Sequence, residues 1–459
     1  MTKIPLYLAL SAALLAAPIQ AKKNKEAPAP IPPTPYPSTY QAIPYPAVLL
    51  RNATVLDGIG NRIDNADVLM RNGKIEAVGK GLALPEGGMS IDATGKWITP
   101  GIIDVHSHLG VYASPGIAAT SDGNEATNAV TAQVWAEHSV WPQDAGFAKA
   151  LAGGVTSMQI LPGSANLVGG RSVILKNVPS LTAQGMKFPD APYGIKMACG
   201  ENPKRVYGDK GGPSTRMGNM AGYRSAVIDA QAYRKQWDAY EAGGRKGEAP
   251  AQSLRNETLA GVMRGDITVN IHCYRADEMA QMIDLSKEFG FKISSFHHGV
   301  EAYKIADLLA RENICGALWA DWWGFKLEAF DGIEENIALV DRPAGGCAVV
   351  HSDSSEGIQR LNQEAAKVMA SAKRVDMNIT PEHAIRWVTS NAAKALRIDD
   401  KTGSLSPGKM ADVVVWNGTP FSSYAKAEQV YIDGALLYDR NNKALQPKAD
   451  FIIGQEGQP

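Results

Sequence analysis

The sequence predicts a (β/α)8 barrel inserted into a small β-sandwich domain that is built from both ends of the chain. Three observations support this prediction: short apolar runs alternate with longer helical segments, eight such runs can be counted, and both chain ends have a strand-and-turn pattern. A chain of 459 residues can hold a barrel of about 250 residues and one smaller domain. We expect the barrel at 98–401 and the β-sandwich domain at 47–97 and 402–459.

The eight apolar runs alternate with helix-forming stretches, which is the pattern of a parallel sheet made from βα units. Eight runs favour a closed barrel over an open doubly wound sheet, and no glycine-rich dinucleotide fingerprint follows the first run. About 65 residues, 201–266, separate the fourth run from the fifth. We expect this insertion at the strand-exit end, where it can form part of the active-site wall. The runs lie at residues 97–108, 154–162, 171–177, 193–200, 267–274, 292–298, 314–320 and 347–353.

Both chain ends have the pattern of short strands separated by tight turns. Before the barrel, glycine-containing turn signals recur at residues 57–58, 71–73 and 86–88. After it, the segments ADVVVWNG (411–418) and EQVYIDGALLYD (428–439) have strand composition. The two ends can pair in one sheet only if the residues between them form an inserted domain.

The first 21 residues have the pattern of a secretory signal peptide. Lys3 precedes an apolar run of about a dozen residues, and the segment ends in small residues at Ala21. The run is shorter than the ~20 residues of a bilayer span, so we expect no membrane span in the mature chain. Residues 22–46 are rich in Pro and Ala, favour extended polyproline geometry and are expected to form a linker. The mature protein is therefore expected in the periplasm or outside the cell.

Composition narrows the range of partners. The formal net charge is -1 and no basic stripe stands out, which argues against nucleic acid. The expected partner is a small-molecule substrate of amide or peptide-like character, and assembly into a homo-oligomer stays open. The four cysteines are scattered rather than spaced as a disulfide framework, so buried packing is their expected role even in an oxidising compartment. They are Cys199, Cys273, Cys315 and Cys347.

Histidines gather at the ends of the apolar runs, and the carboxyl ends of barrel strands converge on one face. His138 and His383 lie in helical stretches instead and are expected to be structural. The other six of the eight histidines end runs: His106, His108, His272, His297, His298 and His351. We therefore expect a histidine-rich site at the barrel mouth.

The first run ends in a His-x-His pair. His106 and His108 are two apart on a strand, so both side chains leave the same face and can bind one metal ion together. A single His-x-His is a weak signal. Here His272, His298 and Asp353 end later runs in the order that a metal site requires, so the pattern predicts a metal centre.

Two segments carry a family resemblance. Residues 99–108, TPGIIDVHSH, and residues 403–414, GSLSPGKMADVV, resemble the amidohydrolase superfamily, specifically its imidazolonepropionase-like branch. The similarity runs from about Leu49 to Tyr438. It implies a metal-bearing barrel joined to a β-sandwich made from both chain ends, in agreement with the pattern of strands. The motifs are specific for the superfamily and say little about the substrate.

The resemblance also implies roles for individual residues. His106 and His108 would bind the more buried metal ion, and His272 and His298 would bind a second ion. Asp353 would contact metal and shuttle the proton. His297 is a rival to His298, which is preferred because Gly299 follows it in the family's His-Gly pattern.

The fourth run offers two candidates for the residue that would bridge two metal ions, and the choice between them stays open. Lys196, if carboxylated, is one alternative, because Ile195 and Met197 suit the helix-facing side and leave Lys196 pointing into the barrel. Glu201 is the other, because it lies just beyond the strand end and needs no modification. If neither binds metal, the site is mononuclear.

The residue types fit hydrolysis of a carbon–nitrogen bond in an amide, cyclic amide or peptide-like substrate. One or two divalent ions, zinc or a similar borderline ion, would activate water to hydroxide, and Asp353 would pass its proton to the leaving nitrogen. Two other functions stay open. A ring-amidine deaminase would use the same metal and aspartate, and a catalytically inactive binding protein could keep the barrel.

Other polar and aromatic residues at run ends are candidates for substrate binding. Arg171, Tyr274 and Arg275 could bind a substrate carboxylate, because arginine matches it in a bidentate fork. Asn202-Pro203-Lys204-Arg205 adds positive charge at the same rim. The alternative is that these groups form salt bridges with acids such as Asp277 and Glu278. Three tryptophans follow the seventh run and fit either the pocket wall or the core: Trp319, Trp322 and Trp323.

Overall fold

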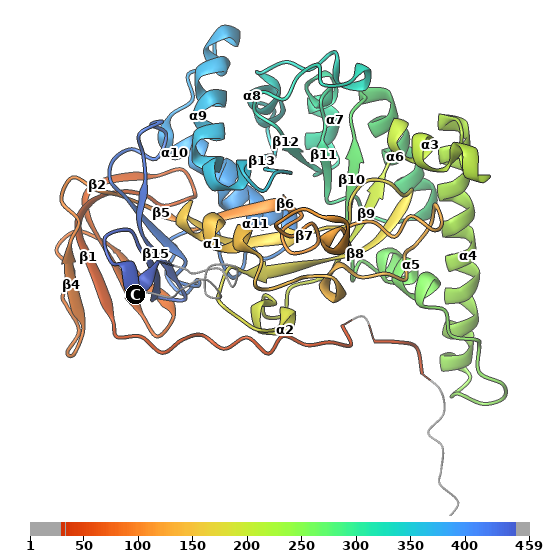
Figure 1. The fold of residues 1–459 in the computed structure, drawn as a ribbon, viewed down its shortest axis with the longest axis horizontal. Helices are drawn as coiled ribbons and strands as arrows, with labels where there is room; N and C mark the ends of the chain where they lie inside the picture. Colours follow the sequence, from red (N-terminus) through yellow and green to blue (C-terminus); the bar gives the residue numbers. More distant parts are fainter. Residues whose placement is uncertain (1–28, 33, 447–459) are drawn as a thin grey trace, which may run out of the picture.

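The computed structural model describes residues 29–32 and 34–446, and Figure 1 shows their arrangement. The expected signal peptide, residues 1–21, lies outside the described residues. A central sheet is surrounded by helices, and a second sheet lies at one end of the molecule (Figure 1). Within the described ranges, no helix combines the length and the apolar character that a membrane crossing needs.

The central sheet is an eight-stranded, nearly closed barrel of the TIM type. Its strands pair in sequence order, from the first to the last. Each of the eight predicted runs overlaps one of these strands, because each run is apolar enough to be buried on both faces, and β8 begins three residues before its run. The strands are β6 (Ile102–Ser107), β7 (Val155–Ile160), β8 (Val168–Lys176), β9 (Gly194–Ala198), β10 (Thr268–Cys273), β11 (Ser295–His298), β12 (Cys315–Leu318) and β13 (Ala348–Val350).

The third strand corrects the expectation of a uniformly parallel barrel. β8 runs antiparallel to β7 and to β9, whereas the other paired strands of the barrel are parallel. Only residues 161–167 connect β7 to β8. A parallel connection needs a crossover of about a dozen residues or more, so this short loop forces the chain to turn back on itself.

Hydrogen bonds join the first strand of the barrel to the end of the last. The amide of Asp353 donates to the carbonyl of His106 at 3.0 Å. The amide of Ser352 donates to Asp104 Oδ1 at 3.2 Å, and the Ser352 hydroxyl donates to the same carboxyl group. Asp104 is fully buried, and burial raises its pKa to about 7. These contacts fix the end of β13 beside the His106 segment.

The helices cover the barrel, and the long insertion after β9 folds as three of them. These three are α3 (Glu201–Tyr207), α4 (Arg216–Ala242) and α5 (Leu254–Arg264). Thr215 begins α4 by accepting a hydrogen bond from the Gly218 amide, as an N-cap does. The other helices are α1 (Ala145–Ala152), α2 (Ala183–Met186), α6 (Ala276–Phe289), α7 (Ala306–Arg311), α8 (Asn336–Asp341), α9 (Leu361–Ser371), α10 (Pro381–Ala384) and α11 (Ser390–Leu396).

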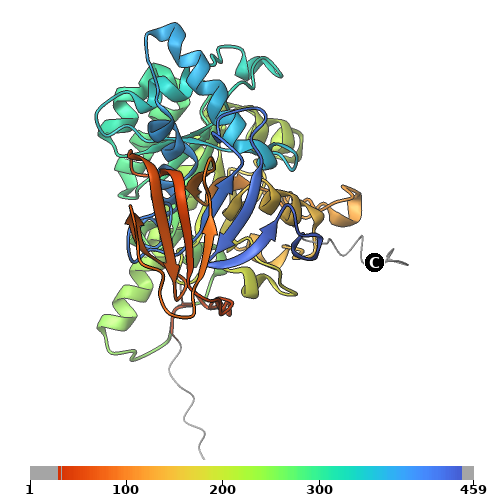
Figure 2. The same cartoon turned by 90° about the vertical axis from the view of Figure 1, so that its left-hand side faces the viewer.

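Both chain ends build one sheet, in which β5 pairs antiparallel with β14. The strand order is β16-β15-β14-β5-β1-β2-β3, and β4 pairs with β1. Figure 2 shows the strands of the two chain ends side by side. The sheet has its own apolar core, which includes Leu50, Ile98 and Tyr431. The strands are β1 (Val48–Leu56), β2 (Arg62–Arg71), β3 (Lys74–Gly79), β4 (Met89–Asp92), β5 (Trp97–Pro100), β14 (Val413–Trp416), β15 (Ala427–Ile432) and β16 (Ala435–Asp439).

The described part of the Pro-rich segment, residues 29–32 and 34–46, runs along the barrel (Figure 1). Ser38 donates its hydroxyl hydrogen to the Lys187 carbonyl at 2.6 Å, and Lys187 Nζ donates to the Tyr36 carbonyl at 2.6 Å. The Tyr36 ring also lies edge-on to Trp135, with centroids 5.5 Å apart. This part of the segment is therefore held against the barrel surface.

The expectation that the cysteines serve only as buried packing is wrong. Cys199 and Cys273 form one disulfide, and Cys315 and Cys347 form another. Each disulfide joins neighbouring parallel strands, whose pairing brings the Cα atoms within 5.2 Å and 4.6 Å. The first lies at the carboxyl ends of β9 and β10, beside the histidine-rich mouth. The second lies at the start of β12 and β13.

Candidate metal centre

Three predicted ligands converge at the seam between β6 and β13. Asp353 Oδ1 lies 3.4 Å from His106 Nε2 and 3.1 Å from His108 Nε2. The two imidazole Nε2 atoms are themselves 3.3 Å apart. Their ligand atoms all lie within 4.8 Å of one another, as a shared metal ion requires. Strand alternation explains the arrangement, because His106 and His108 leave β6 and the turn after it toward the same side.

Of the two candidates for a bridging ligand, the structure brings Lys196 to this cluster. Lys196 Nζ lies 3.3 Å from His106 Nε2, and the side chain is 1% exposed. Burial lowers the pKa of Lys196 to about 8, which favours a neutral and nucleophilic amine. Glu201 points elsewhere, because its Oε1 atom is 3.3 Å from Lys326 Nζ.

His272 and His298 form the second part of the cluster. Their ring centroids are 4.7 Å apart, and His298 Nδ1 lies 3.9 Å from Asp353 Oδ2. His272 Nε2 is 3.3 Å from the side-chain amide nitrogen of Asn202. The other ring nitrogen, His272 Nδ1, is buried and has no hydrogen-bond partner among the residues that the structure describes. A buried nitrogen without a partner is costly unless it has a ligand, so this residue fits a metal site.

Two further histidines lie in the cluster: His297, which the sequence offered as the rival to His298, and His351, which it indicated only as a strand-ending residue. His297 Nδ1 is 2.7 Å from His106 Nδ1, and His297 Nε2 is 2.7 Å from the Ser295 hydroxyl. His351 Nε2 is 3.1 Å from His298 Nδ1. His106, His297 and His351 form a second group whose ligand atoms lie within 4.8 Å. A ring nitrogen used in such a contact fixes the orientation of the neighbouring ligand histidine.

The electrostatics of the cluster favour metal binding. Burial lowers the pKa of His106, His272 and His297 well below its usual range, and the nearby Lys196 lowers it further. Burial also lowers the pKa of His351 to about 4. Imidazoles with such pKa values are neutral at pH 7 and offer a lone pair to a metal ion.

Asp353 is the carboxylate of this cluster. Burial acts to raise its pKa, but the hydrogen bond and the charge of His108 outweigh burial, so the pKa is lowered from its ordinary value. The side chain is 22% exposed, so solvent reaches the carboxylate. Asp353 is therefore ionised and placed both to bind metal and to accept a proton.

The three predicted substrate-binding residues have different surroundings. Tyr274 lies at the cluster, with its ring centroid 4.7 Å from that of His272. Arg171 is not brought to the histidines: it donates to Thr258 Oγ1 at 2.9 Å, and its guanidinium lies over the Trp135 ring at 4.1 Å. Arg275 donates two hydrogen bonds of 2.9 Å to Asp277, as the salt-bridge alternative requires.

The loop after β12 supplies the wall beside His298. The Trp319 ring stacks on His298 with centroids 4.2 Å apart, and Trp322 stacks on Trp319 at 4.7 Å. A cavity of about 370 Å³ lies beside His298 and is lined by all three predicted tryptophans. A larger cavity, about 750 Å³, opens near the starts of β10, β11 and β12, at the other end of the barrel, and no histidine lines it.

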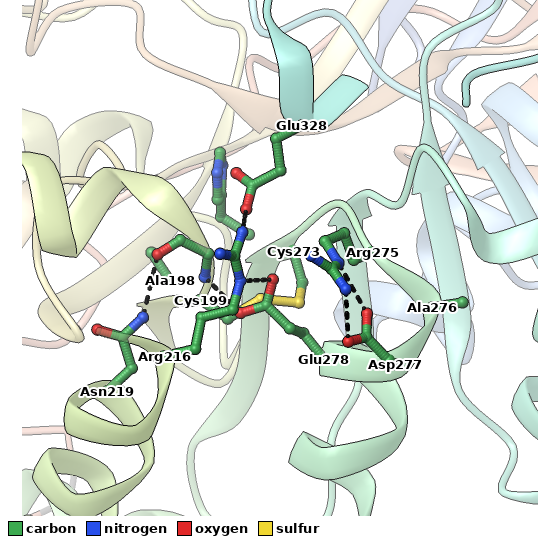
Figure 3. Close-up of a disulfide and its surroundings, with 12 residues drawn as sticks. Ala198, Cys199, Arg216, Asn219, Cys273, Arg275, Ala276, Asp277, Glu278 and Glu328 are labelled. Atoms are coloured by element: carbon green, nitrogen blue, oxygen red, sulfur yellow. Dashed lines mark hydrogen bonds and ion pairs between the residues drawn. A yellow bond between two sulfur atoms is a disulfide. The ribbon is translucent and has the colours of Figure 1, made fainter. Parts of the chain in front are cut away.

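Charged residues hold the turn between β9 and α3 (Figure 3). The amide of Gly200 donates to Glu278 Oε1 at 3.1 Å, and the amide of Glu201 donates to the Glu328 carboxylate at 3.1 Å. Arg216 joins both acids: its Nε lies 2.9 Å from Glu278 Oε2, and its Nη2 donates to Glu328. The start of α4 is thus bound to the start of α6 and to the loop after β12.

Comparisons with known proteins agree with this geometry. A model of the amidohydrolase family matches residues 331–443. Amidohydrolase tasK of Hapsidospora irregularis is 34% identical over 421 residues, which are 86% of this chain and 42% of that protein. The chain thus spans less than half of that relative. Imidazolonepropionase of Mesorhizobium japonicum is 24% identical over 397 residues, which are 80% of this chain and 90% of that protein.

A solved structure has a similar fold over most of this chain. The crystal structure of an amidohydrolase from Thermotoga maritima MSB8 is 37% identical, with a TM-score of 0.79, and the match covers 86% of this chain and all of that one. A TIM-type barrel with a histidine and aspartate cluster at its strand ends defines the class of protein. The chain belongs to the amidohydrolase superfamily, in its imidazolonepropionase-like branch. Hydrolysis of carbon–nitrogen bonds is the activity that these family names carry.

Proposed function

We propose that this protein hydrolyses a carbon–nitrogen bond of an amide, cyclic amide or peptide-like substrate and needs one or two divalent metal ions. The single observation that carries the proposal is the position of Asp353 Oδ1, 3.4 Å and 3.1 Å from the Nε2 atoms of His106 and His108. A carboxylate that shares a site with two imidazoles suits zinc or a similar borderline ion. The names of the relatives support the reaction class.

The ligand set follows from the cluster. His106, His108 and Asp353 would hold one ion. Lys196, carboxylated on its buried amine, would extend the set toward His272 and His298 and allow a second ion. When bound, a divalent ion supplies Lewis acidity, which acidifies water and polarises the carbonyl of the scissile bond.

The chain's own residues account for proton transfer and orientation. Asp353 is ionised, so it accepts a proton from the attacking water and passes it to the leaving nitrogen as the carbon–nitrogen bond breaks. His108 keeps its ring orientation through a 2.8 Å contact between Nδ1 and the Leu161 carbonyl. Tyr274 and Trp319 are 3% and 7% exposed and shield the histidines from bulk water.

Further expectations about location, domains and assembly belong with this proposal. We propose export to the periplasm or beyond, and two disulfides in the described chain support an oxidising compartment. We also propose that the sheet built from both chain ends closes into a β-sandwich and that the domain boundaries are those expected from the sequence. Assembly into a homo-oligomer is a further proposal.

Metal analysis combined with a substrate screen tests the proposed function. The purified protein is assayed for bound metal and for hydrolysis of N-acyl amino acids, dipeptides and cyclic imides, with ring amidines as the competing class. We expect metal-dependent hydrolysis in at least one of the first three classes. Turnover confined to ring amidines would instead assign the protein as a deaminase.

A further inference from the structure

The loop after β12 places a cation next to the metal cluster. Lys326 Nζ lies 3.2 Å from Asn202 Oδ1, and the Asn202 amide nitrogen lies 3.3 Å from His272 Nε2. One amide group therefore separates the ammonium from a candidate metal ligand. The Lys326 side chain is 19% exposed, so it is reachable from the barrel mouth but largely shielded from solvent.

The other neighbours of Lys326 are aromatic rings and one carboxylate. Its Nζ lies 4.2 Å from the Tyr274 ring centroid and 5.7 Å from the Phe325 ring centroid. Glu201 Oε1 is 3.3 Å away, and the Glu201 side chain is 35% exposed. Burial lowers the pKa of Lys326, whereas Glu201 acts to raise it. A half-buried ammonium held by one partly exposed carboxylate can exchange that partner for a carboxylate of a ligand.

Resting on the proposed function, we propose that Lys326 binds the carboxylate of the substrate and that Phe325, Tyr274 and Trp319 contact its apolar side chain. The substrate class is then an N-acyl amino acid or dipeptide with a free carboxylate and an apolar or aromatic side chain. In such a molecule the carboxylate carbon is two bonds from the scissile nitrogen. A reacting bond at the histidine cluster would therefore place the carboxylate near the rim where Lys326 lies.

The assignment replaces the arginines that the sequence indicated. Arg171 is packed over Trp135, and Arg275 is engaged by both oxygens of Asp277. Arg216 is shared between Glu278 and Glu328. Lys326 is the cation that the structure places over Tyr274, beside the histidines.

Calorimetric titration of the full-length, metal-loaded protein tests the proposal without turnover. The probes are 3-phenylpropionate and 3-phenylpropan-1-ol, which share an aromatic ring, have no carbon–nitrogen bond and differ in the carboxylate. A hydrogen bond to a charged group is strong enough that we expect the acid to bind at least tenfold more tightly than the alcohol. Lys326→Met should remove this difference by weakening the acid alone, and Lys326→Arg should keep most of it.

Two further variants sharpen the test. Glu201→Gln removes the competing carboxylate, so it should tighten binding of the acid and leave the alcohol unchanged. Lys287→Met is the matched control, because Lys287 pairs with Glu312 at the other end of the barrel, and it should change neither affinity. Equal affinities for the two probes, no measurable binding of the acid, or an unchanged acid affinity in Lys326→Met would each overturn the proposal.

The experiments distinguish a failure of the carboxylate site from a failure of the proposed reaction. A wild-type protein that prefers the acid through Lys326 but hydrolyses none of the screened compounds would refute the proposed reaction and support the carboxylate site. Hydrolysis of N-acetyl-L-phenylalanine with no effect of Lys326→Met on its KM would refute the carboxylate site and support the reaction.

Discussion

Lys196 Nζ lies 3.3 Å from His106 Nε2 inside the barrel, and Lys196 is 1% exposed. A lysine buried to this extent is costly as a cation and reactive as an amine. Addition of carbon dioxide to the neutral amine, with loss of one proton to solvent, would give an anionic carbamate that could bind a metal ion beside the neighbouring imidazoles.

The first prediction is that Lys196→Ala lowers the metal content, whereas Glu201→Ala keeps it. The reason is that Lys196 lies in the cluster and Glu201 pairs with Lys326. Metal stoichiometry after loading with and without bicarbonate measures the effect, and bicarbonate should increase loading of the wild type. Normal loading of Lys196→Ala with two ions would contradict the assignment.

A second prediction separates binding from turnover at Asp353. Asp353→Asn should keep most of the metal, because the amide still offers an oxygen, but should lose a hundredfold or more in rate, since proton transfer contributes about 10²–10⁴. Metal content and kcat are measured on the same preparation. A rate near that of the wild type would rule out the proton shuttle, and joint loss of metal and thermal stability would indicate a structural role instead.

Arg216 provides a third prediction, on stability. Arg216→Met leaves Glu278 and Glu328, with side chains 6% and 3% exposed, without their shared cation. Removal of one partner from such a buried network should destabilise the fold by about 3 kcal/mol. Adding Glu328→Gln to Arg216→Met should recover part of the loss. Denaturant unfolding curves measure both steps, and an unchanged midpoint for Arg216→Met would contradict the network's role.

The two disulfides give a fourth prediction with a built-in control. Replacing either pair by alanine should cost about 2–4 kcal/mol of stability. Only the Cys199→Ala/Cys273→Ala variant should also weaken metal binding, because Cys273 follows His272 directly at the mouth of the barrel. The Cys315→Ala/Cys347→Ala variant changes the start of β12 and β13 and should bind metal as the wild type does. Equal metal affinity in both variants would show that the first disulfide does not position the site.

Periodicity and composition predicted much of the fold, because buried strands must be apolar and βα units repeat. All eight predicted runs overlap barrel strands, and the two chain ends pair through β5 and β14. The direction of β8 was not predicted, because an apolar run is the same in either direction and only the short 161–167 loop decides it. The cysteine pairs were missed because 74 and 32 residues separate partners that lie on neighbouring strands.

The candidate site was predictable where chemistry coincides with strand ends. His106, His108, Lys196 and Asp353 all lie on or just beyond strands, so their convergence follows from the barrel. Lys326 lies in a loop with no such pattern, and only the folded loop places it over Tyr274. Arg171 was predicted to bind substrate but does not lie at the histidines, because its strand is antiparallel and its side chain packs against Trp135.

Metal content of the His106→Ala/His108→Ala variant tests the central claim most directly. The two imidazoles and Asp353 form the candidate metal group at the end of β6, and no third residue would replace two lost ligands. Elemental analysis of the full-length variant, beside the wild type loaded in the same way, should show loss of bound metal together with loss of hydrolysis. A full metal complement in the double variant would contradict the account.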